Sequence, residues 1–272
     1  MSGDLQLPVR KIYIDTRYKT AGSKSDTDFK FQLPYPISLP DKCVCFIDDV
    51  VIPNSWYTID STNNKIYARR VTLASDARTD KVITLTTNNY SVQSLRDELQ
   101  EKLNDAFNSG FNVVYNPSEL SFTINTDSPV YTIKFYTDEE IKNGNAHNFE
   151  LDINLDTANE ILGNFIPQAS SSIKTSMIDL RRHHNIYISS PNIANFKTMG
   201  SRGESDIIKK IPVSSDYGSV IYDQVVANHD YIDVSKLQLN ILEFKFTDVK
   251  GNVIDLRGLP VSFSMIFMID NE

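Results

Sequence analysis

The C-terminal stretch from Leu237 to Ile269 constrains the fold more than any other part of the chain. Its apolar residues first alternate as in a β-strand and then shift phase by one position between Ile241 and Leu242, which indicates a β-bulge. After a turn around Gly251, a second alternating run becomes apolar on both faces, as in a strand buried between layers. A chain that ends in its most hydrophobic strand has to close its fold there, so we expect the earlier strands to receive this one.

The bulk composition is that of an ordinary globular protein. The chain has 272 residues, 40% hydrophobic and 23% charged, which suffices for one large β domain or two smaller ones. The net charge of −8 argues against a dominant phosphate-binding role. No run of 18 apolar residues occurs, and the first residues lack the apolar core of a signal peptide. We therefore expect no membrane span and a protein made in a cytosolic or nuclear compartment.

The only two cysteines, Cys43 and Cys45, fall on the same face of a predicted strand. Neighbours at this spacing are poorly placed to form a disulfide with each other. We therefore interpret them as reduced thiols in the core rather than as redox or metal-binding groups.

The first sixty residues are predicted to form strands separated by polar or proline-rich segments. Alternating apolar residues indicate strands at Val9–Asp15, Phe29–Leu33 and Cys43–Ile52. The polar stretch 16–28 is expected to be a loop or an extended arm. Prolines at positions 34, 36 and 40 are expected to stop the second strand and to confine it to an edge or a connection. Trp56, the only tryptophan, is interpreted as a plug that fills a corner of the core.

The middle of the chain contains one long amphipathic helix among short strands. The helix is predicted at Tyr90–Phe107, with Ser91 as its N-cap and a stop at residues 108–110. The short strands are predicted at Lys65–Arg70, Lys81–Thr86, Phe111–Asn116, Leu120–Thr126 and Val130–Thr137. A short helix near Thr157–Gly163 is expected to lead to the next part. The middle of the chain is therefore predicted to form a small α+β unit.

The C-terminal part returns to strands. They are predicted at Ile173–Leu180, Asn185–Ser190, Ile207–Val213 and Ser219–Val226, ahead of the closing pair. The stretch Pro191–Ser205 is expected to be an exposed loop that is available for contacts. So many strands without β-α-β alternation favour a sandwich or a jelly roll.

No arrangement of residues in the sequence indicates catalysis. Adjacent strand residues point to opposite faces, so neither the double histidine in Arg181–His184 nor Asp48-Asp49 is expected to act as a pair. No P-loop, HExxH or G-x-S-x-G motif occurs. Arg181–His184 is interpreted as the polar start of a strand that makes surface or interface hydrogen bonds. The basic residues near the amino terminus are interpreted as a mainly solvated arm. We therefore expect no enzyme activity, no cofactor, and a binding or structural role.

Five segments follow one another in a characteristic order along most of the chain. They are KIYIDTRYKTAGSKSDTDFKFQLP, VVIPNSWYTI, ITLTTNNYSVQSLRDELQEKLN, ANEILGNF and DVSKLQLNILEFKFTDVKGNVIDLRGLPVSFSMIF. In this order they resemble the minor capsid, or penton, proteins of viruses with double-jelly-roll major capsids, such as Polinton-type viruses and virophages. Each segment alone is a short set of strand and turn signals, so the resemblance rests on their succession.

The resemblance implies a mainly β fold: a single jelly-roll sandwich with an inserted small α+β unit. The alternative is two successive β domains. We place an N-terminal arm and the first jelly-roll strands in residues 1–60, the inserted unit in 61–168 and the remaining jelly-roll strands in 169–272. In such a fold, the phase shift between Ile241 and Leu242 is interpreted as a bend that lets one long strand serve both sheets.

The resemblance also implies a structural capsid protein that forms pentamers at icosahedral vertices and contacts major capsid trimers. Its partners would be itself and the major capsid protein, within a virion capsid assembled in the host cytoplasm or nucleus, with no small-molecule substrate and nucleic acid not expected. A ring uses heterologous contacts between different surfaces of adjacent copies. We expect the contacts with the major capsid protein to come from the arm Met1–Lys24 and the loop Pro191–Ser205. The predicted interface residues are Arg10, Arg17, Tyr18, Lys19, Arg181, Arg182, Phe196 and Arg202.

Two functions from other classes remain open from the sequence. A receptor- or carbohydrate-binding β domain, such as a fibre head, predicts that Trp56 and Tyr57 are accessible. An enzyme on a jelly-roll fold, such as a cupin, needs a cluster of metal-binding histidines and acids.

Overall fold

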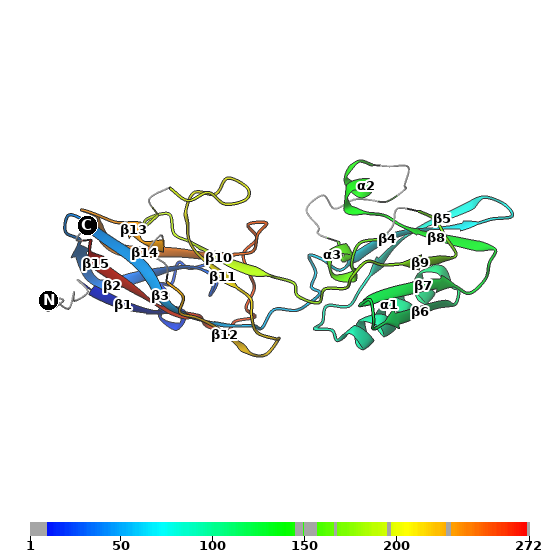
Figure 1. The fold of residues 1–272 in the computed structure, drawn as a ribbon, viewed down its shortest axis with the longest axis horizontal. Coiled ribbons are helices and arrows are strands. Elements are labelled where there is room, and N and C mark those ends of the chain that lie inside the picture. Colours follow the sequence, from blue (N-terminus) through cyan, green and yellow to red (C-terminus); the bar gives the residue numbers. More distant parts are fainter. Residues whose placement is uncertain are drawn as a thin grey trace. The chain divides into compact units, whose positions relative to one another are not determined.

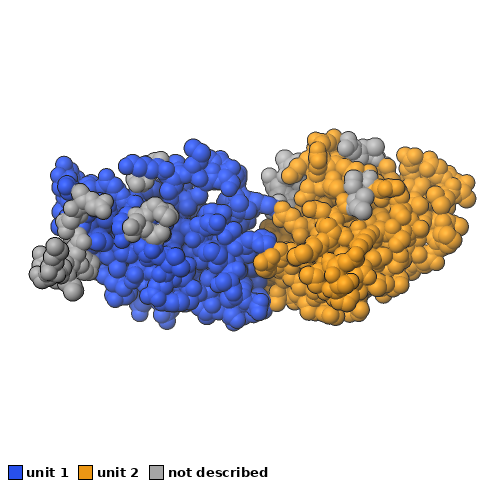
Figure 2. Space-filling view, viewed as in Figure 1, with its two compact units in different colours: residues 1–56, 183–272 blue, residues 57–182 orange. Residues whose placement is uncertain are grey.

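The computed structural model of the protein describes residues 10–144, 149, 157–165, 168–194, 197–226 and 230–270. The chain forms two compact units, which are coloured separately in Figure 2. Unit 1 consists of Met1–Trp56 and His183–Glu272, and unit 2 of Tyr57–Arg182. The chain therefore begins unit 1, builds unit 2 and then returns to complete unit 1.

Unit 1 is built from two antiparallel sheets in a jelly-roll arrangement (Figure 1). The first sheet has the order β1 (Arg10–Asp15), β15 (Ser262–Ile269), β3 (Cys43–Pro53) and β12 (Val220–Asp223), and β13 (Ile232–Asp233) also pairs with β3. The second sheet has the order β11 (Ile207–Pro212), β10 (Asn185–Ser189), β14 (Gln238–Thr247) and β2 (Asp28–Ser38). The mainly β, jelly-roll-like fold predicted from the sequence is confirmed.

The core of unit 1 lies between the two sheets and is centred on aromatic side chains. Phe29 of β2 and Phe244 of β14 face Phe263 of β15, and the rings of Phe244 and Phe263 meet edge to face at 4.9 Å. All three are buried, and burial of such a side chain contributes about 1.5–3 kcal/mol. Cys43 and Cys45 are free thiols buried in the same core, as expected.

The closing strands β14 and β15 lie in different sheets. The pairing of β14 with β2 shifts register between Leu239 and Ile241, which confirms the predicted bulge. Leu239 and Leu242 are buried on either side of the shift, whereas Ile241 is exposed. The interpretation that this strand serves both sheets is wrong, because the strands that β14 pairs with in the described part of the chain, β10 and β2, both belong to the second sheet. The register shift is instead confined to the pairing of β14 with β2, where it lies opposite the proline-rich part of β2.

Contrary to the prediction, the prolines do not end strand β2. β2 continues through Pro34 and Pro36 to Ser38 and lies at the edge of its sheet. Its pairing with β14 passes directly from Gln32 to Ile37, so the prolines fall where no cross-strand pairing is needed. Proline lacks the N–H that a ladder requires, and an edge strand tolerates this loss.

The described part of the predicted N-terminal arm belongs to the jelly roll, so the expectation of a solvated arm is wrong from Arg10 onward. β1 pairs with β15 along its whole length, from Arg10 opposite Phe267 to Asp15 opposite Ser262. Thr16 is fully buried, and its backbone N–H and side-chain oxygen both bond to the backbone of Val261. Residues 1–9 lie outside the described residues.

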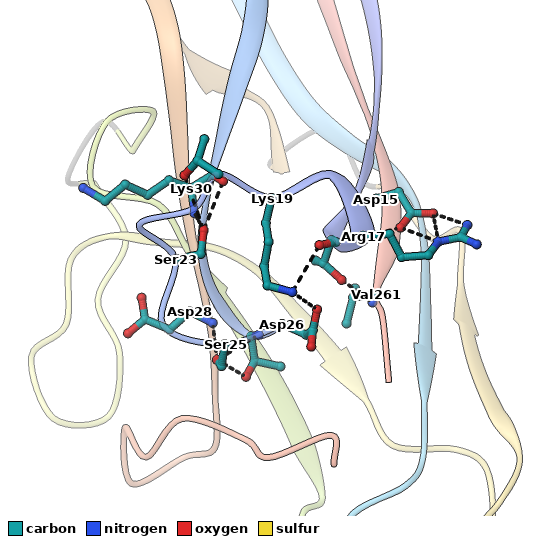
Figure 3. A network of polar contacts seen from close by, with 12 residues as sticks. Asp15, Arg17, Lys19, Ser23, Ser25, Asp26, Asp28, Lys30 and Val261 are labelled. Atoms are coloured by element: carbon teal, nitrogen blue, oxygen red, sulfur yellow. Dashed lines mark hydrogen bonds and ion pairs between the residues drawn. The ribbon is translucent and has the colours of Figure 1, made fainter. Parts of the chain in front are cut away.

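The segment after β1 is a compact loop held by local hydrogen bonds (Figure 3). It begins with a single 3-10 turn, η1 (Thr16–Tyr18). Lys19 Nζ lies 2.7 Å from Asp26 Oδ1, and the hydroxyl of Ser23 accepts a hydrogen bond from the backbone N–H of Lys30. This polar stretch is therefore ordered by its own side chains rather than by apolar burial.

Unit 2 combines two three-stranded sheets with one long helix. The sheets are β5 (Ala77–Thr84), β4 (Lys65–Thr72) and β8 (Tyr131–Phe135), and β6 (Phe111–Asn116), β7 (Ser121–Thr126) and β9 (Ser172–Lys174). The helices are α1 (Val92–Phe107), α2 (Asp138–Lys142) and α3 (Asn159–Leu162). Ser91 caps α1 as predicted, and Asn108 ends it in the left-handed conformation. Leu95, Leu99 and Leu103 are fully buried in a core separate from that of unit 1.

The boundaries of unit 2 differ from the expected range of 61–168. The unit runs from Tyr57 to Arg182, so residues 169–182 belong to it. The cause is strand pairing: β9 bonds to β7, with Ile173 opposite Ile124. The strand predicted at 173–180 is therefore shorter and lies in unit 2.

Candidate interaction surface

A bulge in β3 brings Asp48 and Asp49 together on the outer face of the first sheet. β15 pairs Ser264 with Asp49 and the next residue, Met265, with Ile47, so Asp48 is the extra residue. The Ser264 hydroxyl hydrogen-bonds Asp49 and lies 3.4 Å from Asp48 Oδ2. The prediction that the two carboxylates point to opposite faces is wrong, because the bulge breaks the alternation at this point.

Lys11 of β1 completes this polar cluster. Its Nζ lies 2.7 Å from Asp48 Oδ2, and the hydrogen bond to Asp48 raises the pKa of Lys11 above its usual value. Since β15 lies between β1 and β3, the contact ties three strands together. The carboxylates are engaged in holding the sheet, which is a structural use of them rather than an acid/base one.

Exposed tyrosines gather where β1 and β2 form one lateral side of unit 1. Tyr13 is 73% exposed and Tyr18 77%, and Tyr35 of β2 is also exposed. The Arg10 guanidinium donates to the Tyr35 hydroxyl at 2.5 Å and so links β1 to β2. A hollow of about 330 Å³ opens beside Tyr13 and Tyr18, with Phe31 in its lining. We call Arg10, Tyr13, Tyr18, Tyr35 and this hollow the β1 edge.

Four of the predicted interface residues, Arg10, Arg17, Tyr18 and Lys19, lie on or beside the β1 edge. The Arg17 guanidinium binds both carboxylate oxygens of Asp15, and these hydrogen bonds hold the pKa of Asp15 below its usual value (Figure 3). Lys19 is half-buried and paired with Asp26. Of the four, Tyr18 presents the most exposed side chain.

The other predicted interface residues do not join this surface. Arg181 is exposed and bonded to its near neighbour Asp179. Arg182 is largely buried and donates to the hydroxyl of Thr62 at 2.5 Å, so it anchors a loop of unit 2. Phe196 lies outside the described residues.

Arg202 lines a separate polar hollow of about 240 Å³, on the outer side of the second sheet. Its backbone N–H bonds to Glu204, and its guanidinium lies close to Gly251, where a Cβ atom would meet it. Arg202 therefore lies within the expected contact loop, away from the tyrosines of the β1 edge.

Trp56 fills a core corner, as predicted. It is buried, and its ring meets that of His183 at 5.3 Å in an edge-to-face arrangement. His183 is itself buried, so it is no part of a polar surface at the strand entry. The accessible Trp56 that a receptor- or carbohydrate-binding domain predicts is not found.

Sequence reasoning missed the opposite lateral side of unit 1. Here Lys209 of β11 forms a buried ion pair with Asp223 of β12, with 2.8 Å between Nζ and Oδ2. Outside this pair, apolar side chains are exposed: Tyr217, Val220, Tyr222 and Val225, which we call the β12 edge. The sequence feature that could have indicated this edge is the unbroken apolar run Val220-Ile221-Tyr222. Only one face of an edge strand is needed for the core, so a strand that is apolar on both faces leaves apolar side chains exposed.

The described residues offer neither a metal site nor a membrane-spanning helix. No group of three or more His, Cys, Asp or Glu side chains is placed there to hold a metal ion. No helix within the same residues is long and apolar enough to cross a membrane.

The fold is similar to that of a protein of known structure. The crystal structure of the SeMet-labelled mavirus penton protein matches with a TM-score of 0.54 and 11% sequence identity, over 95% of this chain and 99% of that chain. At this identity the likeness establishes a penton-like fold. No curated protein matches the sequence. The sequence model of the family of unknown function DUF5901 matches residues 44–241, so the chain belongs to this family.

Proposed function

We propose that this protein is a structural capsid subunit: a minor capsid, or penton, protein that forms pentamers at icosahedral vertices and contacts major capsid trimers. One observation carries the proposal. Both the jelly roll and its inserted unit are covered by the similarity to the mavirus penton protein, which extends over nearly the whole of both chains. A shared domain alone would cover only part of each chain.

The bonding of the described polar groups supports a structural role. Lys11, Asp48 and Ser264 tie three strands of one sheet, and Lys209 with Asp223 joins the two sheets. Charged groups used in this way stiffen the sandwich. A protein at a capsid vertex needs a rigid scaffold that carries variable loops. On this proposal the protein uses no cofactor, substrate or catalytic group.

The proposed partners are further copies of this chain and a major capsid protein, within a virion capsid. For the major capsid contact we retain the loop Pro191–Ser205. Met199 in this loop is 88% exposed, and the side chain of Arg202 in the same loop is 61% exposed. Exposed apolar and arginine side chains are the types enriched at protein interfaces.

The test is the symmetry of the purified protein. We expect negative-stain microscopy and native mass spectrometry to show five-fold rings with about five times the 30.9 kDa chain mass. Monomers or trimers at high protein concentration would contradict the proposal. Co-purification with the major capsid protein of the same virus then tests the vertex contact, and an Arg202→Glu variant is expected to weaken it.

A further inference from the structure

The two lateral sides of unit 1 have the properties of the two halves of one interface. β1 and β12 lie at opposite ends of the first sheet, and among the described residues each pairs with a single neighbour, β15 or β3. β2 and β11 likewise end the second sheet on opposite sides. A cyclic assembly needs two different surfaces, one on each side of the same subunit. The β1 edge and the β12 edge meet this condition.

The two edges also match in the side chains that they expose. The β12 edge presents Val225 at 72% exposure and Tyr222 at 58%. The β1 edge presents Tyr13 and Tyr18 around an open hollow whose lining includes two further aromatic rings and the carboxylates of Asp15 and Asp49. Exposed apolar side chains on one side and an aromatic hollow on the other can bury each other, and tyrosine is enriched in the centres of interfaces.

Charge is complementary between the same two segments. Residues 10–30, which form β1, the adjoining loop and the start of β2, contain six Lys or Arg and three Asp, a net charge of +3. Lys11 and Lys30 are paired with Asp48 and Glu243 outside the segment, and with these two partners counted the net charge is +1. Residues 213–230, which include β12, contain three Asp and no Lys or Arg, a net charge of −3. Asp223 in the second segment is already paired with Lys209, whereas Asp216 is exposed. Opposite charge on the two edges favours their approach and disfavours contact between two like edges.

We propose that the β12 edge of one copy of this chain packs against the β1 edge of the next, head to tail around the ring. Tyr222 and Val225 of one subunit would cover Tyr13, Tyr18 and the hollow of its neighbour. This inference rests on the proposed pentamer and adds to it which surfaces meet. Two copies that met through the same edge, β1 to β1 or β12 to β12, would instead form a closed dimer. Repulsion between the like charges of two identical edges opposes this arrangement.

Two variants of the full-length protein test the proposal, each disabling one edge. The first is Tyr13→Glu with Tyr18→Glu, and the second is Tyr222→Glu with Val225→Glu. The control is Met199→Glu with Val249→Glu, which places the same charges on exposed positions of unit 1 outside both edges. Tryptophan fluorescence and thermal melting of each variant establish that unit 1 remains folded.

Sedimentation velocity is expected to show rings for the wild type and the control, and monomers for each edge variant alone. An equimolar mixture of the edge variants is expected to give a one-to-one dimer after amine cross-linking, since each variant retains the edge that the other lacks. Rings formed by either edge variant, or a mixture that stays monomeric at ten times the wild-type ring-forming concentration, would overturn the edge assignment. A wild-type protein that never forms rings would overturn the proposed pentamer as well, so the two failures are distinct.

Discussion

The buried ion pair between Lys209 and Asp223 offers the sharpest test of how the jelly roll is held together. Lys209 lies on β11 of the second sheet and Asp223 on β12 of the first, so the pair closes one side of the sandwich. Their side chains are only 7% and 12% exposed. Lys209 Nζ also donates to the carbonyl oxygens of Val225 at 2.8 Å and Ile47 at 3.4 Å. The ammonium group is therefore solvated by the protein rather than by water.

The perturbation is Asp223→Ala, which leaves the Lys209 ammonium buried without its counter-ion. Removing one partner of a buried ion pair typically costs about 3–5 kcal/mol of unfolding free energy. The two carbonyl acceptors remain, so we expect the lower end, about 3 kcal/mol. For a unit of this size, that loss corresponds to a decrease in melting temperature of about 6–12 °C.

Trp56 makes the assay specific for unit 1. It is the only tryptophan in the chain and is buried in the jelly-roll core, so urea unfolding followed by its emission reports on this unit. All variants are compared at one protein concentration, because assembly changes apparent stability. The control is Asp41→Ala, which breaks the exposed pair with Lys236 and should change stability by no more than about 1 kcal/mol.

The double variant Lys209→Met with Asp223→Leu separates pairing from packing. Replacing both charges by apolar groups of similar size is often neutral or stabilising. We therefore expect the double variant to recover most of the loss caused by Asp223→Ala. A single variant that costs less than about 1 kcal/mol, or a double variant no more stable than the single one, would refute the reasoning.

Three further outcomes are expected. Cys43 and Cys45 should resist a thiol reagent in the native protein and react on unfolding in urea, because burial raises the pKa of both thiols; rapid native labelling would contradict their core placement. Deleting residues 1–20 should abolish soluble, folded unit 1, because it removes β1 and uncovers β15; soluble protein with native tryptophan emission would show that β1 is dispensable. Gly163→Ala should destabilise unit 2 by at least about 1 kcal/mol, because φ is +77° there and a Cβ would collide with the Met177 carbonyl; the check is the calorimetric transition of unit 2, with Gly22→Ala as the control.

Part of the candidate surface was accessible from the sequence. The interleaving of basic and tyrosine residues near the amino terminus drew attention to Arg10 and Tyr18, which lie on the β1 edge, and their role in an interface stays a prediction. It could not show that β1 is a paired strand, since its partner β15 lies at the other end of the chain. The β12 edge was missed because exposure of Val220 and Tyr222 depends on which strand ends the sheet.

The convergence of Asp48 and Asp49 illustrates the same limit. Alternation along a strand is a sound rule for regular backbone, and it predicts opposite faces for neighbours. The bulge that breaks the rule arises from pairing with Ser264, more than two hundred residues away. No local feature of the sequence indicates this bulge.

The sequence by itself determined the elements whose causes are local. Alternating apolar residues defined most strands, and the Ser91 cap and the left-handed Asn108 bounded α1, because these signals act between near neighbours along the chain. Only the tertiary structure decided which strands pair, which edges are left exposed, and that Lys209 meets Asp223 across the sandwich. These outcomes depend on contacts between distant segments, whose partners are selected when the two sheets bury their common core.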